Sequence, residues 1–148
     1  MRPPEGALRR AREKGSAVLE FALLGTLFVT LLAGAMEFSR LFFATIEVAN
    51  AARAGAQYGI QSSANSSDIT GMQTAATNDA PDVAGLTATA SQFCTCSDGT
   101  STACGSGGCS SKRTYVKVVT NATFTTLGTY PLIPNSIPIS AKVSIRVK

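Results

Sequence analysis

The first third of the chain contains a long apolar stretch. Residues 21–36 read FALLGTLFVTLLAGAM and include no charged side chain. As an α-helix, a stretch of this length measures about 24 Å. The apolar residues just before it, 17–19, bring it to the shortest lengths that span a bilayer, about 17 residues. The pattern therefore predicts a helix that crosses a membrane once.

The helical pattern continues beyond this stretch. Small and apolar side chains recur at steps of three and four, at Phe38, Leu41, Phe42, Thr45, Val48, Ala49, Ala52 and Ala56. We expect one helix over residues 16–60, apolar in its first half and amphipathic in its second. Gly55, Gly59 and the Ser/Asn-rich residues 62–67 are expected to end it.

The remaining residues, 61–148, predict an α+β domain. Asp68 and the two serines before it can cap a short helix from Ile69 to about Asn78. Alternating apolar and polar residues then predict about three strands, over 86–91, 116–124 and 137–147. Strands with one apolar face are expected to form a small antiparallel sheet packed on the long helix. The proline-containing residues 126–138 are expected to form a loop.

Positive charge is concentrated at the N-terminus. The first fourteen residues hold five basic and two acidic side chains, which account for +3 of the net charge of +4. This distribution describes a short tail, not a basic groove, and argues against a nucleic-acid partner. A basic tail before an apolar helix is typical of a cytoplasmic flank. We therefore expect a single-pass protein with a cytoplasmic N-terminus and an extracytoplasmic C-terminal domain.

Three interpretations of the N-terminal region compete. It can be a plain single-pass anchor, or a secretory signal peptide with Ala33-Gly34-Ala35 as its cleavage site. It can also be a prepilin-type leader, residues 1–15, that is removed ahead of the apolar stretch. Two features favour the leader. The helical pattern does not stop at the signal-peptide site, and a charged Glu20 at the head of the apolar stretch is costly in a membrane unless it has a partner.

The residues around Glu20 resemble a known family. Residues 15–21, GSAVLEF, resemble the processing motif of Tad (tight adherence) pilins and pseudopilins. Residues 15–24 and 36–59 resemble, more narrowly, the TadE-like minor pilins. The E-F-x-R and A-A-R-x-G-A steps typical of that family correspond here to Glu37-Phe38-Ser39-Arg40 and Ala51-Ala52-Arg53-Ala54-Gly55-Ala56.

The resemblance implies a role for each of these residues. A prepilin peptidase would cut between Gly15 and Ser16, and Glu20, followed by Phe21, would become the fifth residue of the mature chain. There Glu20 would neutralise the new N-terminal amine within its own chain or a neighbouring one. Alternatively, Glu20 only lies at the cytoplasmic membrane interface. The residues assigned to helix packing are Glu37, Phe38, Arg40 and Arg53.

The family resemblance also implies partners and a location. The expected partners are the prepilin peptidase, other Tad pilins and minor pilins, and the pilus assembly platform. The expected location is the bacterial inner membrane, with possible presence in the pilus at the cell surface.

Four cysteines lie close together in a Gly/Ser-rich segment: Cys94, Cys96, Cys104 and Cys109. Zinc bound by four thiolates is an alternative, but the spacing is uncommon for such sites. An extracytoplasmic segment favours disulfides, which persist in oxidising compartments. Of the three possible pairings we favour the nested one, Cys94 with Cys109 and Cys96 with Cys104.

Catalytic chemistry has little support in the sequence. Histidine is absent, which excludes Ser-His and Cys-His nucleophile pairs and every histidine-containing metal site. We find no phosphate-binding loop and no paired carboxylates, and we predict no catalytic site, cofactor or metal. The leading prediction is a TadE-like minor pilin or pseudopilin. The alternative is a membrane-anchored binding module whose cysteine loop recognises a ligand.

Overall fold

A computed structural model describes the backbone of residues 5–105, 109, 111–130 and 133–147, and the side chains of these residues from Ser16 onward. The helices are α1 (Glu5–Ile60), α2 (Ser63–Ser67) and α3 (Ile69–Asp79). The strands are β1 (Thr87–Cys96), β2 (Ser101–Thr102), β3 (Lys112–Thr125) and β4 (Ser136–Arg146). Two compact units divide the chain at residues 39 and 40, and α1 contributes to both. The predicted α+β class is confirmed.

The long helix begins earlier than the sequence pattern predicted. α1 starts at Glu5 and ends at Ile60, so it passes through Gly15 without interruption. The prediction that Gly55 and Gly59 help to end the helix is wrong, because both lie inside it. Both backbones are buried against α3, so these glycines serve close packing and not helix termination.

α3 begins where the sequence predicted. The carboxylate of Asp68 accepts a hydrogen bond from the Gly71 N–H at 2.9 Å and caps the helix at its N-terminus. α2 is capped in the same way, because the Ser62 hydroxyl accepts from the Asn65 N–H at 3.1 Å. These caps satisfy amide groups that a helix cannot pair internally.

The sheet is antiparallel, with the strand order β2-β1-β3-β4. It contains one strand more than the three predicted, the two-residue β2. β1 also extends to Cys96 and β3 begins at Lys112, so Cys94 and Cys96 lie in a strand and not, as predicted, in the segment between strands. Pro138 lies in β4, an edge strand, where a residue without an N–H is tolerated.

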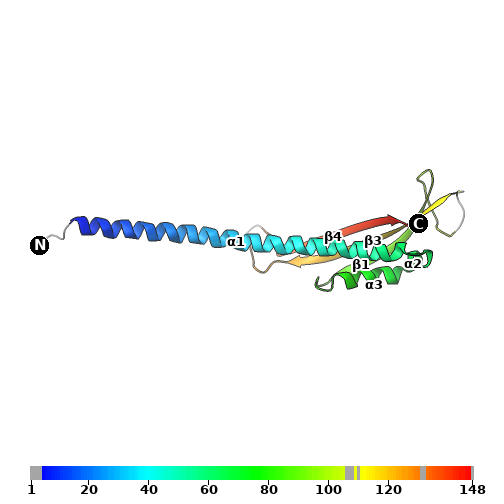
Figure 1. Ribbon diagram of the computed structural model, residues 1–148, viewed down its shortest axis with the longest axis horizontal. Helices are drawn as coiled ribbons and strands as arrows, with labels where there is room; N and C mark the ends of the chain where they lie inside the picture. The colour runs from blue at the N-terminus through cyan, green and yellow to red at the C-terminus, as the bar shows by residue number, and fades with distance from the viewer. Residues whose placement is uncertain (1–4, 106–108, 110, 131–132, 148) are drawn as a thin grey trace. The chain divides into compact units, whose positions relative to one another are not determined.

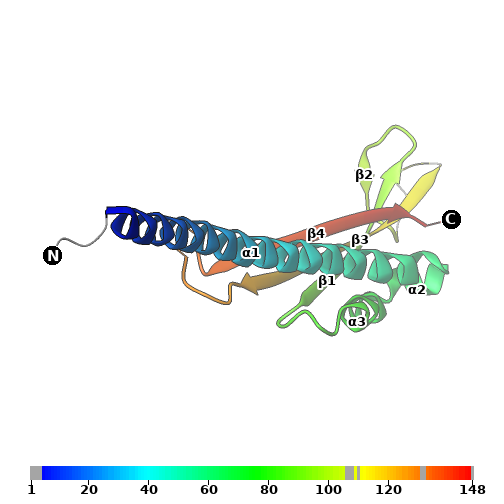
Figure 2. The same ribbon diagram turned by 60° about the vertical axis from the view of Figure 1, so that its left-hand side comes forward.

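In the unit 40–148, helices cover one face of the sheet. The last part of α1 and the whole of α3 lie on this face, with α3 beside β1 (Figures 1 and 2). Along β3 the residues that face the helices are buried: Val116, Val118, Thr120, Ala122 and Phe124. This is the alternation that the sequence predicted for this strand.

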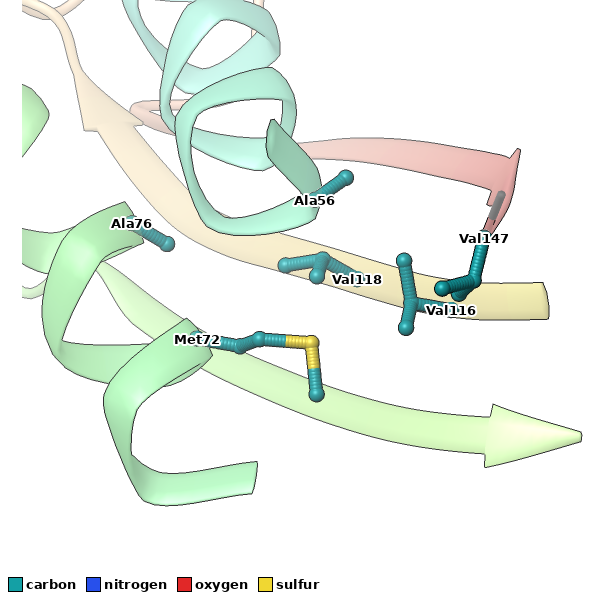
Figure 3. Packing of buried hydrophobic residues seen from close by; sticks show 6 residues of the cluster. All are labelled: Ala56, Met72, Ala76, Val116, Val118 and Val147. Carbon is teal, nitrogen blue, oxygen red and sulfur yellow. The ribbon is translucent and has the colours of Figure 1, made fainter. Parts of the chain in front are cut away.

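The core joins both helices to the central strand. Met72 and Ala76 of α3 meet Ala56 of α1 and the two valines of β3, Val116 and Val118 (Figure 3). Met72 and both valines are fully buried. Full burial of a side chain of this size contributes about 1.5–3 kcal/mol. A second cluster, around Val48 and Phe124, continues the core toward the start of the unit.

One buried polar contact ties α1 to the sheet. Thr120 is fully buried in β3, and its hydroxyl donates to the carbonyl oxygen of Val48 at 2.8 Å. A buried hydroxyl without a partner would be costly. Because the partner is a single carbonyl, the bond also sets which turn of α1 faces β3.

Candidate assembly helix and disulfide-bonded loop

The apolar segment of α1 exposes its side chains on all sides. Large hydrophobic side chains are between 54 and 79% exposed at Val18, Leu19, Phe21, Leu23, Leu24, Leu27, Phe28, Val29, Leu31 and Leu32. A helix that is apolar all round is stable only when lipid or other protein covers it. By length and composition α1 can cross a membrane, with a mean hydropathy of 2.0 in its most apolar window, and it can serve as an anchor or a signal.

A polar pair lies at the head of this segment. The Ser16 hydroxyl donates to Oε1 of Glu20 at 3.4 Å, across one helical turn. Both residues are exposed. The geometry places the carboxylate next to the residue that would follow the expected cleavage site. Phe21, beside Glu20, is the most exposed large apolar side chain among those that the structure describes, at 79%.

The four residues assigned to helix packing lie in different surroundings. Glu37 is half-buried, while Phe38 is 62% exposed. Arg40 packs within the unit 40–148, where its guanidinium carbon lies 5.2 Å from the ring centroid of Phe124. Such a cation–π contact contributes about 0.5–1 kcal/mol at a partly exposed site. Arg53 is exposed.

Packing around Arg53 comes from its small neighbours. Ala51, Ala52, Gly55 and Ala56 are buried against the rest of the unit. A β-carbon on Gly55 would lie 2.6 Å from the backbone oxygen of Met72, closer than such atoms can approach. These small residues belong to the A-A-R-x-G-A step, and Gly55 was expected from the sequence to help end the helix. In the sequence these small residues recur at steps of three and four, which places them on one face of the helix. A face of small residues indicates close contact with a neighbouring element.

The turn between α1 and α3 is fixed by a hydrogen bond that the sequence did not reveal. The Tyr58 hydroxyl donates to Oδ2 of Asp68 at 2.8 Å. The hydrogen bonds from the Gly71 amide and from Tyr58 lower the pKa of Asp68 below its ordinary value, whereas the bond to Asp68 raises the pKa of Tyr58. Asp68 therefore caps α3 and anchors the end of α1 at the same time.

The cysteines form two disulfides, as the sequence predicted, but in a different pairing. Cys94 bonds to Cys104 and Cys96 to Cys109, so the predicted nested pairing is wrong. The register explains the difference. β2 returns along one edge of β1 with Thr102 opposite Cys94, which brings Cys104 back to Cys94. β3 begins on the other edge of β1, opposite Cys96.

Disulfide formation accounts for all four thiols. All four cysteines are described, and none of them is free. The residues that the structure describes contain no group of three metal-ligating side chains. A zinc site would need the cysteines as free thiolates, whereas here their sulfur atoms are bonded in disulfides. The hairpin from β1 to β2 is closed by Gly99, at a φ of 90°, and by Asp98, whose pKa is lowered by hydrogen bonds from the amide and hydroxyl of Thr100.

One region of the chain matches a known protein family. It contains the apolar segment, the polar pair at its head and the face of small residues. Residues 15–57 match the family model described as TadE-like protein. No curated protein and no solved structure matches the chain. The match includes Gly15 and Glu20 at one end and Gly55 at the other. Over residues 15–57 the chain is similar to the TadE-like protein family.

Proposed function

We propose that the chain is a minor pilin or pseudopilin that acts structurally in the assembly of a Tad-type pilus. Residues 1–15 are the leader, residues 16–60 the membrane-embedded and packing helix, and residues 61–148 the extracytoplasmic head. The protein resides in the bacterial inner membrane with its N-terminus in the cytoplasm before processing. Its partners are the prepilin peptidase, other pilins and the assembly platform.

The observation that carries the proposal is the single carboxylate at the head of an exposed apolar helix. Glu20 already accepts a hydrogen bond from Ser16. Cleavage after Gly15 gives Ser16 a charged amine, one turn from Glu20. Opposite charges about 4 Å apart attract by about 4 kcal/mol at an effective dielectric constant near 20. An amine or a carboxylate alone in the bilayer would carry its desolvation cost without this gain.

Cleavage requires the helix to open at Gly15. The backbone is helical on both sides of this residue, and a protease needs an extended strand of substrate. Glycine in a helix interior costs about 1 kcal/mol relative to alanine, so Gly15 weakens the helix locally. Gly15 thus serves both local opening and close approach of the peptidase to the backbone.

The mature N-terminus tests processing directly. Intact mass and peptide mapping of the protein isolated from membranes should find Ser16 as the first residue. Met36 as the first residue would indicate an ordinary signal peptide and would refute the proposal. An uncut N-terminus at Met1 would leave a plain anchor and favour the membrane-anchored binding module.

Glu20→Gln separates assembly from membrane insertion. We expect the variant to be inserted and cleaved normally but to be lost from the sheared pilus fraction or from cross-linked subunit complexes. Glu47→Gln, which removes one carboxylate within the unit 40–148, is the matched control and should assemble normally. Normal assembly of Glu20→Gln would contradict the pairing of Glu20 with the new amine.

A further inference from the structure

Exposed large apolar side chains of the unit 40–148 gather at one end of it. Five of them are between 50 and 71% exposed and form what we call the apolar rim: Phe42, Phe43 and Ile46 of α1, and Leu127 and Ile133 of the β3–β4 loop. Elsewhere in the described part of this unit the one exposed large apolar side chain is Phe93, at 36%, and it stacks on Tyr115. A concentration of apolar side chains at one place marks a surface for a partner or a membrane.

Both parts of the apolar rim lie where α1 enters the unit. The guanidinium carbon of Arg40 lies 5.2 Å from the ring centroid of Phe124, which is one residue before the end of β3. Leu41 and Ala44 pack against the same core cluster as Phe124. The loop that follows β3 is therefore close to the first turns of α1 in this unit (Figures 1 and 2).

The β3–β4 loop satisfies part of its own backbone. The Thr126 N–H donates to the carbonyl oxygen of Asn135 at 3.1 Å and closes the loop. Within the loop, the Ile133 N–H donates to the carbonyl oxygen of Tyr130 at 3.3 Å. Backbone groups that are already paired do not lose hydrogen bonds to water when a loop enters an apolar layer. The loop can therefore present Leu127 and Ile133 to such a layer at low cost.

This end of the sheet is also free of charge over a long stretch of sequence. Residues 118–141, which contain the whole loop and the strand ends on both sides of it, include no charged side chain. Along β3, Lys117 lies about 26 Å from the end of the strand, at 3.3 Å per residue. Asp79 and Asp82 belong to the connection between α3 and β1 and not to this loop. An uncharged apolar surface suits a lipid interface, where charged groups are costly.

The outer face of α1 changes character within the unit. Its exposed large side chains are apolar up to Ile46 and polar from Asn50 onward, at Asn50, Arg53 and Gln57. As a helix, residues 17–46 measure about 45 Å. A bilayer with its headgroup layers is about 40–45 Å thick. The apolar outer face of α1 therefore ends at about the height of the outer headgroups.

The position of the rim along the chain selects lipid as its partner. The apolar stretch 21–36 ends four residues before Arg40, a distance of at most about 14 Å even for an extended chain. The end of the unit that carries the apolar rim is thus kept near the membrane surface in any orientation of the unit. Lipid can cover the helix part and the loop part of the rim together.

We propose that the apolar rim docks the unit 40–148 on the lipid bilayer, with its side chains in the headgroup layer on the extracytoplasmic side. The inference rests on the proposed membrane span of α1, but it does not depend on cleavage after Gly15 or on pilus assembly. Cys96 lies opposite Lys112 at the start of β3, so docking by the other end of this strand turns the disulfides toward the aqueous phase.

Tryptophan replacements in the full chain, reconstituted at one chain per lipid nanodisc, test the proposal. The chain has no tryptophan, so each introduced ring reports one position. Leu127→Trp and Ile133→Trp should emit at shorter wavelength than tryptophan in water. Both should lose intensity when the disc is made of phosphatidylcholine brominated in the upper part of its acyl chains. Two reporters in one loop ensure that a folding defect in one variant does not decide the result.

Two further positions serve as controls. Ser97→Trp places the ring at an exposed position of the β1–β2 turn, at the opposite end of the sheet, and should emit as in water without quenching. Leu27→Trp places it in the apolar segment of α1 and should be quenched if this segment spans the bilayer.

An added charge shows whether the native rim, and not the reporter ring, causes the docking. In the Ile133→Trp background, Leu127→Asp should abolish the quenching, because a carboxylate is costly in the lipid interface. Ser97→Asp in the same background is the matched control and should leave the quenching unchanged.

The other outcomes would each overturn the proposal. Quenching of Leu27→Trp without quenching of the two loop reporters would exclude docking and leave the membrane span intact. Short-wavelength emission from the loop without quenching would mean that protein covers the rim. Equal quenching of Ser97→Trp would mean that the head contacts lipid without a preferred end. Absence of quenching in Leu27→Trp would refute the span and the docking together.

Discussion

Replacement of Gly55 by alanine tests the close contact between α1 and α3. The new β-carbon would lie 2.6 Å from the backbone oxygen of Met72, 3.0 Å from the β-carbon of Ala76 and 3.2 Å from Val118. The carbonyl oxygen belongs to the helix backbone and cannot rotate away. Relief therefore requires α3 to shift as a whole, together with the core side chains that it carries.

The expected magnitude is a difference between two opposing terms. Overpacking a well-packed core costs about 1–3 kcal/mol, and a clash with backbone belongs in the upper part of this range. Alanine in place of a helical glycine regains about 1 kcal/mol. We expect the free energy of unfolding of the unit 40–148 to fall by about 1–2 kcal/mol. For a unit of this size, each kcal/mol corresponds to about 4–8 °C in Tm.

Gly59→Ala provides the graded comparison. Its β-carbon would meet the sulfur of Met72 at 2.5 Å, but this atom is near the end of a flexible side chain that can adopt another rotamer. We expect a smaller loss of stability than for Gly55→Ala. Gly25→Ala has no heavy atom within 4 Å of the new β-carbon and should leave the unfolding transition of the unit 40–148 unchanged.

Unfolding of the full chain in micelles can be followed by tyrosine fluorescence, because the chain has three tyrosines and no tryptophan. Far-ultraviolet circular dichroism follows the loss of secondary structure independently. The reasoning is refuted if Gly55→Ala is as stable as the parent protein or more so, or if Gly59→Ala is the more destabilised of the two.

Three further predictions concern the unit 40–148. Thr120→Val should lower the free energy of unfolding by about 1 kcal/mol in urea titrations, through loss of the hydrogen bond to the helix carbonyl, and a neutral effect would exclude that contribution. The double replacement of Cys96 and Cys109 by serine should cost about 3 kcal/mol, since a short disulfide loop restricts the unfolded chain by about this amount; an unchanged denaturation midpoint would contradict it. Because the pKa of Asp68 is lowered in the folded state, its stabilisation is fully present above its ordinary pKa of 3.8 and disappears as pH falls through the lower folded value. Asp68→Asn should flatten this acid-side slope in unfolding measured at successive pH values, and Tyr58→Phe should reduce it in part; an unaltered slope in Asp68→Asn would count against the linkage.

The long helix was predictable because its causes are local. An apolar run, a period of three to four and the absence of proline over residues 16–80 are read directly from the sequence. The cap at Asp68 was equally predictable, since capping depends on residues within one turn of the cap. The alternation in β3 and β4 identified the face that the helices cover. The continuation of α1 through Gly15 was missed, because one glycine weakens a helix without ending it.

The disulfide pairing shows where local reasoning ends. Spacing allowed three pairings, and the preference for the nested one assumed a single hairpin around the loop. The structure places β2 on one edge of β1 and β3 on the other, so Cys94 and Cys96 have partners on opposite sides. Strand order is a property of the whole sheet. The spacing of the cysteines within residues 94–109 therefore cannot predict which of them form disulfides with one another.

For this protein, the sequence by itself determined the exposed apolar helix, the position of Glu20 at its head, the cap of α3 and the presence of disulfides, because each depends on neighbours along the chain. Only the tertiary structure decided the role of Gly55 as a contact point, the bond from Thr120 to α1 and the pairing of the four cysteines. These depend on which residues the antiparallel register and the helix layer bring within a few ångströms of one another.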